Sequence, residues 1–166
     1  LSTYTVTSNY ISVANNTVST VYNGIVVNSV KGGLTITNNP LISVERNKTF
    51  GLVGNVSSVA NYTRTGIKLT NCFGATVANN PNINSVGTAA ITAANYNKLI
   101  GVFYTNSFGG QVNCNTVSNT GQCFVFKAYC KNSWFANNMS TSYQGLVLSN
   151  SGFIGQQGAP TGTQNL

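Results

Sequence analysis

The sequence reads Thr76-Val77-Ala78-Asn79 near its middle, and this order of an apolar residue, a small residue and an asparagine recurs along the chain. Close and looser copies end at a series of anchor asparagines: Asn15, Asn38, Asn61, Asn79, Asn95, Asn115 and Asn137. Successive anchors are 23, 23, 18, 16, 20 and 22 residues apart. A unit this short cannot bury its own apolar side, so it must stack on copies of itself. The spacing therefore predicts a solenoid.

A second series alternates with the anchors and consists of glycines that precede short apolar runs. Its members are Gly24, Gly51, Gly66, Gly101, Gly121 and Gly145. The runs are rich in β-branched residues and bounded by Asn and Gly, which favours strands, and no stretch shows a capped helical period. Asparagine tolerates the left-handed conformation of a sharp corner, and stacked amides can bond along the axis. We therefore expect at least two short strands per coil and about seven coils of ~20 residues.

This repeat makes a specific prediction about stacking. One interior column is expected to contain Val13, Ile36, Val59, Val77 and Phe135, beside a corner formed by Asn15, Asn38, Asn61, Asn79 and Asn137. Residues 1–154 are expected to form a single β-helix domain. Residues 155–166 lose the periodicity and are expected to form a tail, a cap or a linker.

The scarcity of acidic residues limits the chemistry that is available. Only 5% of the 166 residues are charged, Glu45 is the one acidic residue, and there is no histidine. Glycoside hydrolysis by paired carboxylates, a Ser-His-Asp triad and a carboxylate-lined calcium site all need residues that this chain lacks. We expect no catalytic residue, no metal and no cofactor. Glu45 is the only side chain that could act as a carboxylate acid or base, and its alternative role is a surface pair with Arg46 or Lys48.

The net charge of +7 comes from eight scattered basic residues. It indicates either attraction to an acidic partner, such as an anionic polysaccharide or nucleic acid, or simply the shortage of acids. The four cysteines (Cys72, Cys114, Cys123 and Cys130) are expected to be free and mostly buried, with one bridge among the last three as the alternative. No apolar stretch reaches 18 residues, so no membrane span is expected.

The repeat also supports a resemblance. Units of the form Gly-apolar-x-apolar, then about ten residues, then apolar-Ala-Asn-Asn, resemble the right-handed parallel β-helix repeats of the pectate-lyase-like superfamily over roughly residues 10–154. Phage tailspikes, polysaccharide lyases and epimerases, and many surface adhesins share that fold. The lyase catalytic pattern, clustered Asp for calcium with a basic residue as base, has no counterpart in this sequence.

Aromatic and basic residues gather late in the chain. The candidate carbohydrate-binding residues are Trp134, Tyr143, Lys127, Lys131 and Tyr129. Trp and Tyr stack on sugar rings by apolar contact while their polar edges bond hydroxyl groups, and a nearby lysine attracts acidic sugars. The alternative is that these aromatic side chains fill the interior of the coils.

These observations lead to an expected function. We expect a structural and receptor-binding segment of a phage or virus tail spike or fibre, on the virion or otherwise extracellular, that contacts a host surface polysaccharide. The resemblance implies a homotrimer or other self-assembly, and neither a membrane nor nucleic acid is the expected partner. Two alternatives remain open: a secreted carbohydrate-active enzyme of the same fold whose acids lie outside this segment, and a bacterial adhesin or filament subunit.

Overall fold

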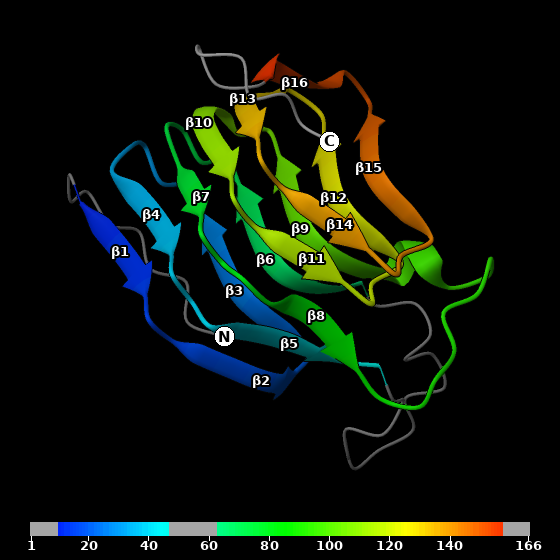
Figure 1. Cartoon of the computed structure of the whole chain (residues 1–166). Helices are drawn as coiled ribbons and strands as arrows, with labels where there is room; N and C mark the ends of the chain where they lie inside the picture. Colours follow the sequence, from blue (N-terminus) through cyan, green and yellow to red (C-terminus); the bar gives the residue numbers. More distant parts are fainter. Residues whose placement is uncertain (1–9, 47–62, 158–166) are drawn as a thin grey trace, which may run out of the picture.

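The computed structural model describes residues 10–46 and 63–157, which coil through three parallel sheets (Figure 1). Sheet A contains β1 (Ile11–Ala14), β4 (Leu34–Thr37), β7 (Thr76–Ala78), β10 (Phe108–Asn113), β13 (Cys130–Phe135) and β16 (Gly152–Gln157). Sheet B contains β2 (Thr17–Val21), β5 (Leu41–Glu45), β8 (Ile83–Val86), β11 (Thr116–Ser118) and β14 (Asn138–Ser140). Sheet C contains β3 (Asn23–Asn28), β6 (Arg64–Thr70), β9 (Leu99–Thr105), β12 (Gln122–Lys127) and β15 (Gln144–Ser149).

The chain visits sheets A, B and C in turn and then returns to A, so every pair of neighbouring strands is parallel and belongs to successive coils. This is the predicted right-handed parallel β-helix, with three strands per coil. The described strands make up five coils of three strands each, and β16 begins a sixth. β16 extends to Gln157, beyond residue 154, the predicted end of the domain.

Residues 10–46 and 63–157 contain five coils and the start of a sixth, compared with about seven predicted for the whole chain. β4 pairs directly with β7, so the coils that contain Ile36 and Val77 are neighbours although they are far apart in sequence. Asn95 lies in the segment between β8 and β9, which includes a 3-10 helix (Tyr96–Lys98), and its Oδ1 accepts a hydrogen bond from the Thr92 amide at 2.7 Å. Its Nδ2 donates to the Ala90 carbonyl at 3.0 Å, so this side chain closes a local turn. Three residues of the predicted repeats lie outside the described residues: the anchor Asn61, the interior-column residue Val59 and the glycine Gly51.

The interior column of sheet A confirms most of the predicted stacking and corrects its last member. Its residues in strand order are Val13, Ile36, Val77, Val112 and Trp134. Trp134, not Phe135, therefore takes the interior position in β13, and Phe135 pairs with Asn113 on the alternate position. Because side chains alternate along a strand, this shift of one residue exchanges the inner and outer faces.

The sequence led us to expect that one asparagine per coil would both form the left-handed corner and stack its amide. In the structure these two roles belong to two consecutive residues. The corner residues with left-handed backbone are Asn15, Asn38, Asn79, Cys114 and Ala136. The next residue in each coil points inward and forms a ladder of amides: Asn16, Asn39, Asn80, Asn115 and Asn137. Asn137 thus belongs to the ladder, and Ala136 occupies its predicted corner position.

The amide ladder ties each coil to the next at the corner between sheets A and B. The Nδ2 of Asn39 donates to the Oδ1 of Asn80 at 2.9 Å, and Asn80 donates to Asn115 at 2.8 Å. Asn115 donates to Asn137 at 3.0 Å, and these four side chains are buried. A buried amide that is fully hydrogen-bonded stabilises one register, because any slip would leave polar groups without partners.

A glycine column at the start of the sheet C strands explains the second repeat. Equivalent positions on β3, β6, β9 and β15 are occupied by Gly24, Gly66, Gly101 and Gly145. On β12 the same position is occupied by Cys123. A Cβ on Gly66 would lie 2.8 Å from Cγ2 of Ile83, so the chain passes too close to sheet B for a side chain there. Gly121, the predicted member, lies two residues before this position.

The four cysteines are free, as predicted, with Cys72, Cys123 and Cys130 buried and Cys114 exposed. Burial raises the pKa of the Cys72 and Cys130 thiols. None of the helical structure in the described part of the chain is long and apolar enough to cross a membrane.

Candidate functional site

The five predicted carbohydrate-binding residues do not form one site. Trp134 lies in the interior with 3% of its surface exposed, and its ring meets that of Phe124 edge-on at 4.5 Å. A side chain in this position cannot stack on a glycan, so the expectation for Trp134 is corrected. Its alternative role, filling the coil interior, is the one observed.

Tyr143 is exposed but separate from the other candidates. It precedes β15 at the corner between sheets B and C, and 54% of its surface is exposed. Its ring stacks on Tyr96 of the segment between β8 and β9, at 4.5 Å and 18°. One face of the Tyr143 ring is therefore already covered by the protein.

Lys127, the last residue of β12, borders a hollow of about 280 Å³ on the outer face of sheet C. We call it the sheet C hollow, and its lining residues are Thr63, Thr65, Lys68, Asn97, Ile100, Phe103, Gln122, Val125, Lys127, Val147 and Ser149. Its floor is apolar, since Phe103, Val125 and Val147 are register partners on β9, β12 and β15. The segment between β8 and β9 contributes Asn97 to the hollow.

Two lysines give the sheet C hollow its charge. Nζ of Lys68 lies 5.9 Å from the centre of the Phe103 ring. Lys127 is two strands away from Lys68, which corresponds to about 10 Å across the sheet. The single carboxylate side chain of the sequence, Glu45, ends β5 in sheet B. The hollow therefore presents positive charge beside an apolar floor, together with the neutral hydrogen-bonding groups of Thr65, Gln122 and Ser149.

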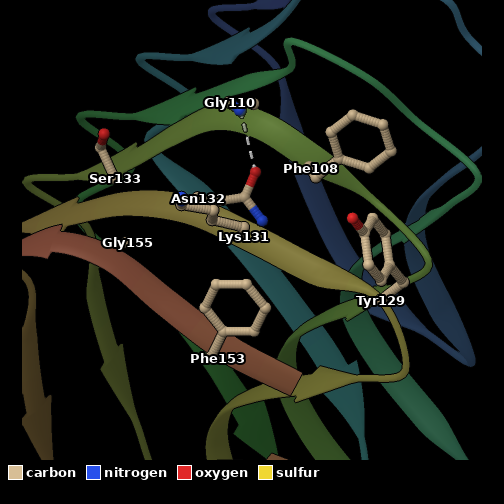
Figure 2. A pocket seen from close by; sticks show the side chains of 9 residues that line it. Phe108, Gly110, Tyr129, Lys131, Asn132, Ser133, Phe153 and Gly155 are labelled. Carbon is tan, nitrogen blue, oxygen red and sulfur yellow. Dashed lines mark hydrogen bonds between the residues drawn. The ribbon is translucent and has the colours of Figure 1, made fainter. Parts of the chain in front are cut away.

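Tyr129 and Lys131 meet at a different hollow, of about 340 Å³, on the outer face of sheet A (Figure 2). We call it the sheet A hollow, and its lining residues are Phe108, Gly109, Gly110, Tyr129, Lys131, Asn132, Ser133, Phe153 and Gly155. Three of its aromatic side chains are exposed: Phe108 by 39%, Tyr129 by 64% and Phe153 by 42%. They come from β10, from the turn before β13 and from β16.

The sequence thus grouped residues that lie apart in the structure, and it missed others. The lining residues that were not predicted as site residues include Lys68, Phe103, Phe108 and Phe153. Lys68, Phe103 and Val125 are consecutive register partners, so a correct alignment of the glycine-led strands would have placed Lys68 and Phe103 near Lys127. The alternation around Phe153 was a weaker signal, because glycines at 152 and 155 flank it.

No three cysteine or glutamate side chains come together in residues 10–46 and 63–157, so this part of the chain offers no set of ligands for a metal ion.

Comparison with models of protein families, with curated proteins and with solved structures gives no match to this chain. Its function has to be inferred from its own surface.

Proposed function

We propose that this chain is a rigid glycan-binding segment of an extracellular assembly, such as a phage or virus tail spike, and that the sheet C hollow binds an acidic glycan. The observation that carries the proposal is the pair of lysines beside an apolar floor, in a chain that has a single carboxylate. The tail-spike part of the proposal rests on the resemblance of the repeat, which also implies self-assembly of copies.

The chemistry of the hollow suits an acidic sugar. A pyranose ring has one apolar face of C–H groups, which would lie on Val125 and Val147, while its carboxylate or sulfate would approach the ammonium groups. The hydroxyl groups would meet Thr65, Gln122 and Ser149. The Phe103 ring is already engaged by Lys68, which makes the hollow less suited to stacking a nucleic acid base.

Binding without cleavage is the expected outcome for the isolated chain. Glu45 lies in sheet B, and its backbone carbonyl accepts a hydrogen bond from Nη1 of Arg64 at 2.9 Å. A general acid or base must reach the proton that it transfers, and Glu45 is outside the hollow where we place the sugar.

A matched pair of ligands tests the proposal: a uronic-acid oligosaccharide and the same oligosaccharide with its carboxylates reduced to alcohols. The double variant Lys68→Ala/Lys127→Ala should weaken binding of the acidic ligand about tenfold in calorimetry at low salt. Added salt should reduce binding of the parent, because exposed charges are screened. The parent should also release no reducing ends from either ligand.

The control variant Lys31→Glu lowers the net charge by the same two units, and Lys31 lines neither hollow. If it weakens the acidic ligand as much as the first pair, the net charge of the chain explains the binding and the hollow does not. If single-stranded nucleic acid binds the parent more tightly than the acidic oligosaccharide, the ligand class is wrong.

A further inference from the structure

The sheet A hollow is chemically unlike the sheet C hollow and needs its own explanation. Phe108 of β10 pairs with Lys131 of β13, which pairs in turn with Phe153 of β16, so an aromatic, a basic and an aromatic residue follow one another across three coils. Tyr129 meets Phe108 edge-on, with ring centres 5.6 Å apart and planes at 86°. Phe108 also packs on Phe73 at 4.6 Å, which holds its ring in place.

The hollow is formed by irregularities in two adjacent strand pairs. The register between β10 and β13 shifts between Phe108 and Gln111, and the register between β13 and β16 shifts between Asn132 and Trp134. Gly109 has a φ of 72°, a left-handed conformation that favours glycine. β-bulges of this kind bend a strand and re-aim its side chains, and here they leave Phe108 at the edge of a concave surface (Figure 2).

A buried amide fixes the floor of the hollow. Asn132 is buried, its Oδ1 accepts a hydrogen bond from the Gly110 amide at 3.0 Å, and its Nδ2 donates to the Ser107 carbonyl at 2.9 Å. These two bonds tie β13 to the bulged part of β10. The aromatic side chains around the hollow are therefore carried on a rigid base, which lowers the entropy cost of binding a ligand between them.

We propose that the sheet A hollow is a second carbohydrate site, separate from the sheet C hollow, which binds an uncharged pyranose ring by stacking. Exposed aromatic rings gathered around a concave surface indicate a binding site. A volume of about 340 Å³ is of the size that small-ligand pockets have. Tyr129 and Ser133 carry hydroxyl groups at the rim that can bond those of a sugar.

The charge of the hollow argues against the other ligand that aromatic rings commonly hold. Nζ of Lys131 lies 6.0 Å from the centre of the Phe153 ring, so a positive charge already occupies the region where a quaternary ammonium ligand would bind. Lysine does not oppose an uncharged sugar. One lysine among three exposed aromatic residues makes stacking the main source of affinity.

The test uses neutral hexose oligosaccharides of gluco, galacto and manno configuration, together with the carboxyl-reduced oligosaccharide. Binding is measured by calorimetry at low and high salt. At least one of these ligands should bind the parent, and binding should be unchanged by salt. Tyr129→Ala and Phe153→Ala should each weaken that binding about tenfold at both salt concentrations, because each removes one ring from the hollow.

Tyr143→Ala is the matched control, because Tyr143 is also an exposed tyrosine but lies at the corner between sheets B and C. It should bind the neutral ligand as the parent does, and Lys68→Ala/Lys127→Ala should do so as well. Unchanged melting temperatures of Tyr129→Ala and Phe153→Ala would show that folding is intact.

Three outcomes would overturn this second site. The first is that none of the neutral ligands binds the parent. The second is that Tyr143→Ala loses as much affinity as Tyr129→Ala. The third is that the parent is a dimer in solution which Tyr129→Ala dissociates, since a second copy would then cover the hollow. Failure of the acidic ligand to bind, with neutral binding intact, would reject only the function proposed for sheet C.

Discussion

The hollows on sheets C and A lie on outward faces of one solenoid and share a motif, a lysine ammonium about 6 Å from a phenylalanine ring. They differ in what surrounds that motif. Aliphatic side chains form most of the floor on sheet C and a second lysine borders it, whereas three exposed aromatic residues surround the hollow on sheet A. The first should hold its ligand mainly by charge and the second mainly by stacking.

This difference shows which part of a coil is free to vary. Inward positions are confined to apolar residues and to the amides of the ladder, because each must stack on its equivalent in the next coil. Outward positions are not bound by that rule, so Phe103, Val125 and Val147 can follow Lys68 in one column while Lys131 separates two phenylalanines in another. One scaffold can therefore carry two kinds of surface.

The largest effect on both hollows is expected from a substitution that disrupts the core of the β-helix. Val77 is fully buried in the sheet A column, and Val77→Asp would place an unpaired charge there. We expect a loss of about 4 kcal/mol in the free energy of unfolding, measured by urea denaturation, and loss of binding at both hollows.

The control is Val26→Asp, because Val26 is exposed on sheet C and should cost about 1 kcal/mol or less. Equal stability of Val77→Asp and Val26→Asp would show that Val77 is not part of a packed column.

A smaller effect is expected from the amide ladder, which fixes the register without lining either hollow. Asn80→Ala would remove the hydrogen bonds that Asn80 makes to Asn39, Asn115 and the Ile36 carbonyl. Those buried partners would be left unsatisfied, at a cost of about 2–3 kcal/mol.

Urea denaturation measures this cost, and binding at both hollows should persist in the folded variant. Asn16→Ala is the control, since Asn16 is at the exposed end of the ladder and should cost much less. A similar loss in both variants would mean that burial of the ladder contributes nothing.

The smallest effect concerns the cysteines, whose labelling should leave both hollows intact. Cys114 is exposed and should react first with a thiol reagent, followed by mass spectrometry of the peptides. Cys72 and Cys130 should react far more slowly, because they are buried and burial raises the pKa of each, which lowers the fraction of reactive thiolate.

If Cys130 reacted as fast as Cys114, the burial of Cys130 in the structure would be contradicted. Cys130 precedes Lys131, so its exposure would mean that the start of β13 opens and that the sheet A hollow is not rigid.

The fold could be predicted from the sequence because stacking imposes one repeating pattern on the inward positions. The number of coils could not, since Asn95 follows the same small-residue pattern as the true corners although its side chain bonds locally to Thr92. Local hydrogen bonds and ladder bonds use the same residue type, so composition does not separate them.

The site was predicted less well because a shift of one residue decides which side chains reach the surface. Asparagine is the residue expected at a left-handed corner, yet Ala136 takes that conformation and Asn137 enters the buried ladder. The hydrogen bonds of the ladder outweigh the cost of a left-handed alanine, about 1–2 kcal/mol. That choice buries Trp134, and no local pattern in the sequence reveals it.

The long steps of the amide ladder have a consequence for engineering. Asn39 bonds to Asn80 across 41 residues and Asn80 to Asn115 across 35, whereas the shorter coils need 23 and 22. Extra residues at the corner between sheets B and C therefore leave the register intact, and lengthening such a loop costs little closure entropy. Residues 87–94 line neither hollow, and they are a permissive point at which a foreign epitope could be grafted and displayed. The corner between sheets A and B allows no such graft, because one inserted residue would pull an amide out of the ladder.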